Sequence, residues 1–322
     1  MNLYPLKFEP IIKERLWGGT KLKEVLGKTI ETNITGESWE LSAVPGDVSV
    51  VANGSLAGTS LQQLIDEHAE TLLGKSVVTR FGKEFPILIK FIDAKKDLSI
   101  QLHPNDVLAK ERHNSFGKTE MWYVMDADPD ANLIVGFNKD VSQEEYAKSL
   151  EDDTLLSLLN YESVQEGDTF FINTGKIHAI GAGVLLAEIQ QTSDVTYRVF
   201  DFNRRDKQGK LRELHTDLAL DAIDYKKKYD FKVAYSKDEN TSNTMVDCPY
   251  FKTNFLKLTS DLVIDTAARD SFTIFMCVSG KAVISNAYGI APIQKGETIL
   301  VPGASSEIAI KSTGAQLLEV TI

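Results

Sequence analysis

The chain has 322 residues, of which 43% are hydrophobic and 25% are charged, which is typical of a folded protein of about two domains and excludes a disordered chain. Its net charge of −11 and its scattered lysines and arginines offer no basic surface, so neither nucleic acid nor a membrane is expected as a partner. Only Cys248 and Cys277 are present, and the first residues lack the pattern of a secretory signal, so we expect a cytoplasmic protein.

Most of the predicted elements are short β-strands between turn residues. In chain order they lie at residues 85–92, 98–103, 121–125, 132–137, 169–173, 183–190 and 196–202, and then at 251–258, 272–278, 281–285, 298–301 and 315–320. This spacing favours an antiparallel sandwich or barrel over alternating strands and helices.

Helical spacing of apolar residues occurs in three stretches, at residues 59–72, 142–159 and 211–223. The first has Thr59 and Gln62 at capping-box spacing, and the second begins with Ser142 and Glu145 at the same spacing. We interpret these helices as additions to a β framework.

An internal repeat links the two halves of the chain. GDTFFINTGKIHAI, from Gly167, is echoed by GETILVPGASSEIAI, from Gly296, and a comparable apolar strand precedes each segment. The repeat predicts an all-β protein of two barrels, divided into residues 1–240 and 241–322.

Four residues of the first half are candidate metal ligands. Gln101 and His103 are two residues apart in a predicted strand and therefore share a face. Glu120 opens the next strand, and His178 follows the turn at Gly175. Two imidazoles, a carboxylate and an amide oxygen can bind one divalent ion, with Zn²⁺ as the first choice and Fe²⁺, Mn²⁺ or Co²⁺ as alternatives. The single carboxylate leaves positive charge on the ion for polarising a substrate oxygen.

Taken alone, each of these residues also fits a structural role, but their combined spacing resembles the metal-binding pattern of cupin (jelly-roll) barrels. The second half has Ser305 and Ser306 where the histidine would fall, so the resemblance implies a degenerate, metal-free second barrel. The other three histidines, at positions 68, 113 and 215, are expected to be structural or solvated.

Longer segments carry a more specific resemblance. LSIQLHPND, GKTEMWYV, NTGKIHAIGAGVLLAEIQQTSDVTYRVFDF and RELHTDLALDAID are similar to class I mannose-6-phosphate isomerases in their shorter bacterial form. The resemblance covers most of the chain and implies reversible conversion of mannose 6-phosphate to fructose 6-phosphate with one divalent ion per chain, usually zinc. We expect a monomer or homodimer.

Such an isomerisation removes a proton next to a carbonyl and must stabilise the resulting enediolate. By resemblance, the carboxylate and the arginine near the reacting carbons fall on Glu188 and Arg198. We expect Glu188 to be the base, because burial can raise the pKa of a carboxyl group, and Arg198 to hold the oxyanion or the phosphate. The alternatives are a surface carboxylate at 188 and an ordinary salt bridge from Arg198 to Asp194 or Asp201.

For the phosphate, the resemblance points to Ser99, Lys90 and Lys118, and Lys118 also belongs to the expected catalytic set. Lys90 interrupts an apolar run, where a buried ammonium is costly unless it meets an anion. The alternative is that its side chain reaches the rim of the barrel.

The chain departs from longer relatives at three positions near this expected site. Gly117 stands where many of them have a histidine assigned to ring opening, Thr119 replaces a proline, and Ile180 replaces a tyrosine. Ring opening is therefore unassigned, with water or His113 as candidates.

Three rival functions remain: a cupin oxygenase, a different sugar-phosphate isomerase, and a non-catalytic cupin that binds a sugar or regulates transcription. An oxygenase would favour three histidines and would need no anion-binding Lys90, Ser99 and Arg198. A non-catalytic cupin would need no Glu188 and Arg198 together.

Overall fold

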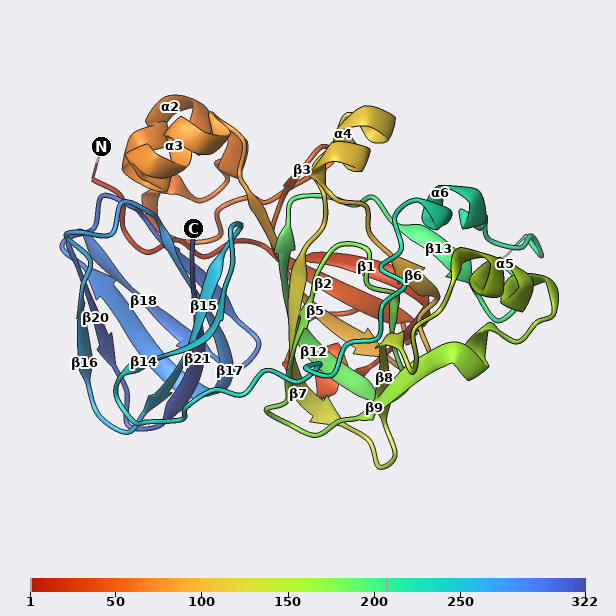
Figure 1. The fold of residues 1–322 in the computed structure, drawn as a ribbon. Helices are drawn as coiled ribbons and strands as arrows, with labels where there is room; N and C mark the ends of the chain where they lie inside the picture. The colour runs from red at the N-terminus through yellow and green to blue at the C-terminus, as the bar shows by residue number, and fades with distance from the viewer. Residues whose placement is uncertain (1, 207) are drawn as a thin grey trace.

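A computed structural model describes residues 2–206 and 208–322 and contains two β-rich bodies side by side (Figure 1). The prediction of an all-β protein with a few helices is confirmed. Among the described residues, no helix combines the length and apolar character needed to cross a membrane.

The first body consists of two antiparallel sheets that pack face to face around a shared apolar core. The larger sheet has the order β1 (Ile11–Gly19), β2 (Thr35–Leu41), β5 (Ile87–Ala94), β12 (Val184–Gln191), β7 (Glu120–Ala127) and β10 (Thr169–Ile172). The smaller sheet has the order β13 (Tyr197–Phe200), β6 (Ile100–Leu102), β11 (His178–Ile180), β8 (Asn132–Phe137) and β9 (Leu159–Ser163).

The central strands of the larger sheet are buried on both faces. Ile89 of β5, Tyr123 of β7 and Ala187 of β12 point outward into a core shared with the second body. Because side chains alternate along a strand, Lys90 and Glu188 point the other way, into the first body. The apolar outer face therefore fixes which polar side chains enter the interior.

The second body is one curled sheet with its own core. It contains β14 (Ser242–Asp247), β15 (Lys252–Leu258), β16 (Leu262–Asp265), β17 (Thr273–Asn286), β18 (Gly289–Gln294), β19 (Thr298–Val301), β20 (Glu307–Lys311) and β21 (Ala315–Thr321). The two strands expected at 272–278 and 281–285 are parts of the single strand β17. Near the N-terminus, Leu6 forms an antiparallel bridge to Leu300, and a small hairpin joins β3 (Ala43–Val44) to β4 (Asp47–Val48).

The internal repeat corresponds to the same turn in both bodies. Gly167 and Gly296 have φ values of 88° and 86°, a conformation that glycine adopts without strain. The amide of Gly167 donates to the carbonyl of Val124 in β7, and the amide of Gly296 donates to that of Cys277 in β17, both at 2.9 Å. The two bodies therefore share a local architecture as well as a sequence pattern.

The three predicted helices exist, with different boundaries. In α2 (Leu61–Leu73) the capping side chain is Ser60, which accepts from the amide of Gln63, rather than Thr59. The cap at Ser142 is as predicted, but α5 (Gln143–Glu151) ends early, and the leucine-rich remainder forms η2 (Leu155–Leu158) and β9. The stretch expected at 211–223 contains only α6 (Thr216–Leu220).

Short helical segments that the sequence did not predict are α1 (Lys21–Glu24), η1 (Gly54–Leu56), α3 (Lys75–Phe81) and α4 (Asp106–His113). Helices α2 and α3 lie over the second body (Figure 1), and the side chain of Asp270 accepts from the first two amides of α3. Helix α4 is capped by Asn105, whose side chain accepts from the amide of Leu108. His113 is the last residue of α4.

Candidate active site

A cavity of about 470 Å³ in the first body brings together the residues that the sequence predicted for the site. Seven of the nine line it: Lys90, Ser99, Gln101, Lys118, His178, Glu188 and Arg198. The other two, His103 and Glu120, are each only 1% exposed. No predicted site residue is displaced to another part of the fold.

Strand β6 is the central strand of the part of the smaller sheet that faces the cavity. Gln101 lies directly opposite His178 on β11 and Arg198 on β13, so the three side chains occupy one face. Ile100 and Leu102 point the other way, into the core beneath α5 and α6. The alternation predicted for this strand is thus present, and it aims the polar face at the cavity.

The two histidines converge on Glu120. The Nε2 atom of His103 is 3.5 Å from one carboxylate oxygen of Glu120, and the Nε2 atom of His178 is 3.4 Å from the other. The Nδ1 atoms donate to main-chain carbonyls, of Val195 at 3.0 Å and of Lys176 at 2.8 Å. Nδ1 therefore carries the proton in both rings, and the Nε2 lone pairs face the carboxylate.

These donor atoms fit a divalent cation. Both Nε2 atoms and both Glu120 oxygens are buried without a hydrogen-bond partner among the described residues, although buried polar atoms are normally paired. Burial lowers the pKa of His178 to about 4 and that of His103 well below its usual value, which keeps both imidazoles neutral. Burial also raises the pKa of Glu120 to about 8. A cation at this point would satisfy all four atoms and the buried carboxylate.

Gln101 is the fourth predicted ligand, and its side chain is already engaged. The hydroxyl of Ser99 donates to the Gln101 carbonyl oxygen at 3.3 Å. An amide oxygen can accept this bond and still offer a second lone pair, so the contact is compatible with metal ligation by Gln101. Ligation by Gln101 stays a prediction.

Glu188 is held in a row of inward-facing side chains across β5, β12 and β7. The ammonium of Lys90 lies 3.1 Å from one carboxylate oxygen, and the indole N–H of Trp122 donates to the other at 3.0 Å. Burial raises the pKa of Glu188, but the ammonium groups of Lys90 and Lys118 outweigh it and lower the pKa overall. The expected upward shift is therefore wrong, and the expected surface alternative is excluded because Glu188 is 3% exposed.

The burial of Lys90 also has a different explanation from the expected one. Its side chain does not reach the rim of the barrel but is buried, and the anion that it meets is the carboxylate of Glu188. Burial in an apolar strand consequently gives no independent support for a phosphate at Lys90.

Arg198 has no such internal partner. Its Nε donates to the Ser99 hydroxyl at 3.3 Å, and one Nη donates to the carbonyl of Glu213 at 2.9 Å. Asp201, a proposed partner, is bound by Arg204 and Arg212 instead. Across residues 2–206 and 208–322, no carboxylate forms an ion pair with Arg198, so its half-buried guanidinium remains available to a ligand anion.

Lys118 contacts Glu120 and is also under the influence of the Glu188 charge. It is 6% exposed, and its ammonium lies 3.4 Å from a Glu120 oxygen. Burial lowers the pKa of Lys118, but the carboxylates of Glu120, Glu188 and Glu37 raise it overall, so the group is charged.

Sequence reasoning missed several residues that line the cavity. All three tryptophans of the chain do so, at positions 17, 39 and 122. A pair formed by Arg15 and Glu37, 2.9 Å apart, and the guanidinium of Arg212 complete the wall. The strands β1 and β2, which carry Arg15, Trp17, Glu37 and Trp39, were not among the predicted elements. The direction of each side chain depends in addition on strand register.

The absence of a side chain at Gly117 has a steric reason. A Cβ atom there would lie 2.7 Å from the amide nitrogen of Asp106 and 2.9 Å from the carbonyl carbon of Asn105. Helix α4 therefore occupies the space that a histidine would need. His113 hydrogen-bonds to the hydroxyl of Tyr197 at 2.9 Å and does not line the cavity.

We expect Gly117→Ala to push the backbone next to Lys118 and lower kcat/KM by ~10-fold or more, since small misplacements at a reacting centre are costly. Steady-state kinetics and the thermal midpoint measure this. Gly314→Ala is the matched control because a Cβ atom there meets nothing within 4 Å. Unchanged kcat/KM in Gly117→Ala would contradict the steric argument.

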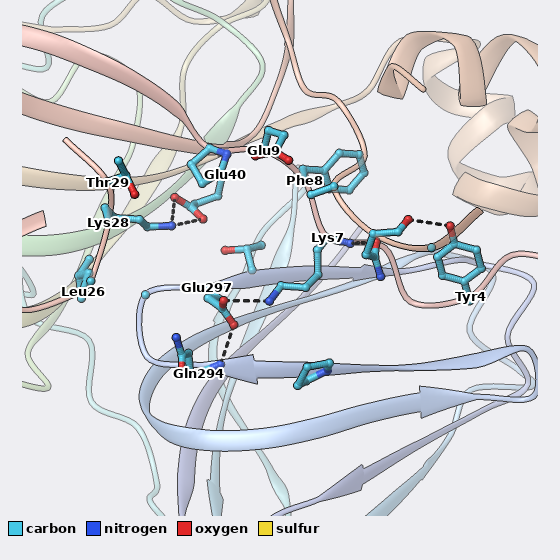
Figure 2. Close-up of a pocket in the computed structure, with 18 of the residues that line it drawn as sticks. Tyr4, Lys7, Phe8, Glu9, Leu26, Lys28, Thr29, Glu40, Gln294 and Glu297 are labelled. Atoms are coloured by element: carbon cyan, nitrogen blue, oxygen red, sulfur yellow. Dashed lines mark hydrogen bonds and ion pairs between the residues drawn. The ribbon is translucent and has the colours of Figure 1, made fainter. Parts of the chain in front are cut away.

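A second cavity, of about 860 Å³, lies where the N-terminal segment meets the second body, and it contains none of the predicted site residues (Figure 2). Four of its five charged side chains form two ion pairs, Lys28 with Glu40 at 2.6 Å and Lys7 with Glu297 at 2.9 Å, and the fifth is Glu9. The smaller cavity is the one in which unpaired donor atoms converge.

Comparisons with known proteins agree with this choice. Residues 5–136 match a family model described as phosphomannose isomerase type I, catalytic domain, and residues 241–320 match one described as mannose-6-phosphate isomerase, cupin domain. Mannose-6-phosphate isomerase ManA of Bacillus subtilis is 35% identical over 314 residues, which is 97% of each chain. The enzyme of that name from Streptococcus mutans is 34% identical over 299 residues, 92% of each chain. A crystal structure of mannose 6-phosphate isomerase from Bacillus subtilis matches with a TM-score of 0.90 at 31% identity, over 99% of this chain and 100% of that one.

Proposed function

The chain belongs to the type I phosphomannose isomerase family, and on this basis we propose that its cavity interconverts mannose 6-phosphate and fructose 6-phosphate. The observation that carries the proposal is the convergence of His103, Glu120 and His178, with ligand atoms within 4.8 Å of one another. Glu188 lies in the same cavity and can serve as the acid–base group that the reaction requires.

His103, Glu120, His178 and Gln101 would hold one divalent ion per chain, and Zn²⁺ is our choice of metal. Two neutral imidazoles and a carboxylate form a donor set that zinc prefers in catalytic sites. When bound, such a cation supplies a Lewis acid that stabilises negative charge on a sugar oxygen.

The proton moves between neighbouring carbons of the open-chain sugar. Glu188 takes the proton from C2 of mannose 6-phosphate, and the electrons of that C–H bond form the C1–C2 double bond of an enediolate whose negative charge lies on O1. Return of the proton to C1 and transfer of the O2 hydroxyl proton to O1 leave a carbonyl at C2, which gives fructose 6-phosphate. The lowered pKa of Glu188 keeps it ionised and ready to accept. Lys118, charged and buried beside both carboxylates, stabilises the negative charge that develops on the substrate.

The phosphate would lie against Arg198 and Ser99. Arg198 is the cavity's guanidinium without a carboxylate partner among the described residues, and its fork suits a phosphate group. Arg212 also lines this part of the cavity, although Asp201 already binds it. Lys90 and Lys118 are already paired with Glu188 and Glu120, so either lysine would bind the phosphate while it keeps this carboxylate partner.

The remaining assignments follow from this proposal. Residues 1–240 would form the metal-binding catalytic domain and residues 241–322 a degenerate, metal-free cupin domain. We propose a cytoplasmic monomer or homodimer, and Cys248 and Cys277, which are both free thiols, suit a reducing compartment.

One experiment tests the function. Purified protein is analysed for metal and assayed for fructose 6-phosphate formed from mannose 6-phosphate, before chelation, after it, and after zinc is restored. We expect about one ion per chain, loss of activity on chelation and its recovery with zinc. Sugar binding without turnover in the metal-loaded protein would favour the non-catalytic cupin instead.

A further inference from the structure

The second body reaches the segment that carries Lys118 and Glu120. Tyr250, in the turn between β14 and β15, donates its hydroxyl proton to the Asp106 carboxylate at 2.6 Å. Asp106 is the first residue of α4, in the first body. This contact therefore crosses between the two bodies, 144 residues apart in sequence.

From Asp106 the hydrogen bonds continue to both sides of Lys118. The second Asp106 oxygen accepts from the amide of Gly117 at 2.9 Å and from the side chain of Gln191 at 3.1 Å. The side-chain oxygen Oε1 of Gln191 accepts from the main-chain amide of Thr119 at 2.8 Å. A proline at 119 would have no amide proton to donate, so the departure from longer relatives makes this bond possible.

The segment thus held has little freedom. Side chains bind the amides immediately before and after Lys118, and Glu120 begins β7 one residue later. The close approach of α4 to Gly117 leaves the same segment little room to move. Because Lys118 and Glu120 face the reacting atoms in the proposed function, small shifts here should change turnover.

The Asp106 carboxylate is suited to this task. Burial raises its pKa, but hydrogen bonds from Tyr250, Gly117 and Gln191 outweigh burial and lower the pKa overall, so the acceptor stays ionised. A charged acceptor makes these bonds stronger than bonds between neutral groups.

We propose that Tyr250 is a positioning residue for the active site: acting through Asp106 and Gln191, it fixes the segment that presents Lys118 and Glu120. The second body would therefore contribute to catalysis through Tyr250, although it is expected to bind no metal. The inference rests on the proposed function for its kinetic consequence, but the geometric part does not.

An effect of the Tyr250 hydroxyl on stability alone can be distinguished from an effect on the position of Lys118 and Glu120. Tyr250, Asp106 and Gln191 lie on the wall of a third cavity, of about 1050 Å³, which is distinct from the active-site cavity. In Tyr250→Phe, water can hydrogen-bond to the Asp106 oxygen but does not tie it to the second body, and the ring still packs, so little stability should be lost.

The test is Tyr250→Phe in the full-length, zinc-loaded protein. We expect kcat to fall about 10-fold with a smaller change in KM, because substrate affinity depends mainly on Arg198 and Ser99. Hydrogen exchange of a peptide covering residues 116–121 should become faster, and zinc should pass more readily to a competing chelator.

Tyr235→Phe is the matched control. That tyrosine also loses a hydrogen bond, to the carbonyl of Gly167 at 2.7 Å, and packs between the bodies against Phe255. Its hydroxyl also interacts with that of Tyr123 on β7, but among the described residues it has no hydrogen bond to Gly117, Thr119 or Asp106. We expect normal kcat and normal exchange at 116–121 in this variant.

A double variant completes the experiment. Since Tyr250 is proposed to act through Asp106, Tyr250→Phe should add nothing to the effect of Asp106→Ala on exchange or on kcat. Wild-type exchange at 116–121 in Tyr250→Phe, or fully additive effects in the pair, would overturn the inference. Exchange needs no substrate, so a wild-type protein without isomerase activity would count against the proposed function while leaving this test intact.

Discussion

His103→Ala is expected to yield a folded protein that retains far less than one zinc ion per chain and shows at least ~10³-fold lower isomerase activity. The expected loss exceeds the ~10–100-fold cost of removing an outer partner of a metal ligand, because this change removes a ligand itself. It would leave His178 and Glu120 as the remaining close pair, 3.4 Å apart. Metal analysis after dialysis and an assay with added zinc measure the two effects.

Circular dichroism and the thermal midpoint must show that His103→Ala folds, because the imidazole is fully buried and its loss leaves a cavity. His68→Ala, on α2 and far from the cluster in the fold, is the control for removing a histidine. The metal assignment would be abandoned if His103→Ala bound a full equivalent of zinc and turned over normally.

The strand pattern was accessible from the sequence because it depends on local periodicity, whereas the four candidate ligands were grouped by their resemblance to cupin barrels. Gln101 and His103 share a face wherever the strand lies, and Ile100 and Leu102 define the opposite face as core. The helix boundaries were less accessible. Asp153 adopts φ 55° just after α5, which ends a leucine-rich pattern that looked helical to residue 159.

Helix α4 escaped detection because its only buried residue is Ala109, so it has no apolar stripe to recognise. Its consequences are large, since it fills the space beside Gly117 and supplies Asp106. A helix that is held by polar contacts rather than by an apolar face leaves little trace in a hydrophobic pattern.

The predicted direction of the Glu188 pKa shift was wrong because it also depends on contacts that the sequence does not reveal. Burial of a carboxylate can be anticipated from a strand, but its cross-strand neighbour cannot, because the pairing of β5 with β12 is a long-range choice of register. That register places Lys90 directly opposite Glu188, and the ion pair reverses the effect of burial. The same contact accounts for the buried lysine without any substrate.

Glu188→Gln is expected to lower kcat by at least ~10² with a modest change in KM, since it removes the proposed base while keeping the size of the side chain. The amide oxygen can still accept from Trp122, so the row of side chains should persist. Loss of the charge leaves the Lys90 ammonium buried without its partner, so the thermal midpoint should also fall.

Two further measurements separate base chemistry from this electrostatic effect. Lys90→Met in the Glu188→Gln background removes the unpaired ammonium and should recover stability without recovering kcat. Proton exchange between solvent and C1 or C2 of the sugar should disappear in Glu188→Gln. The carboxylate is the active form and its pKa is lowered by Lys90 and Lys118, so protonation of Glu188 should not reduce wild-type kcat at neutral or mildly acidic pH. Retained exchange in Glu188→Gln would assign the proton transfer to another group.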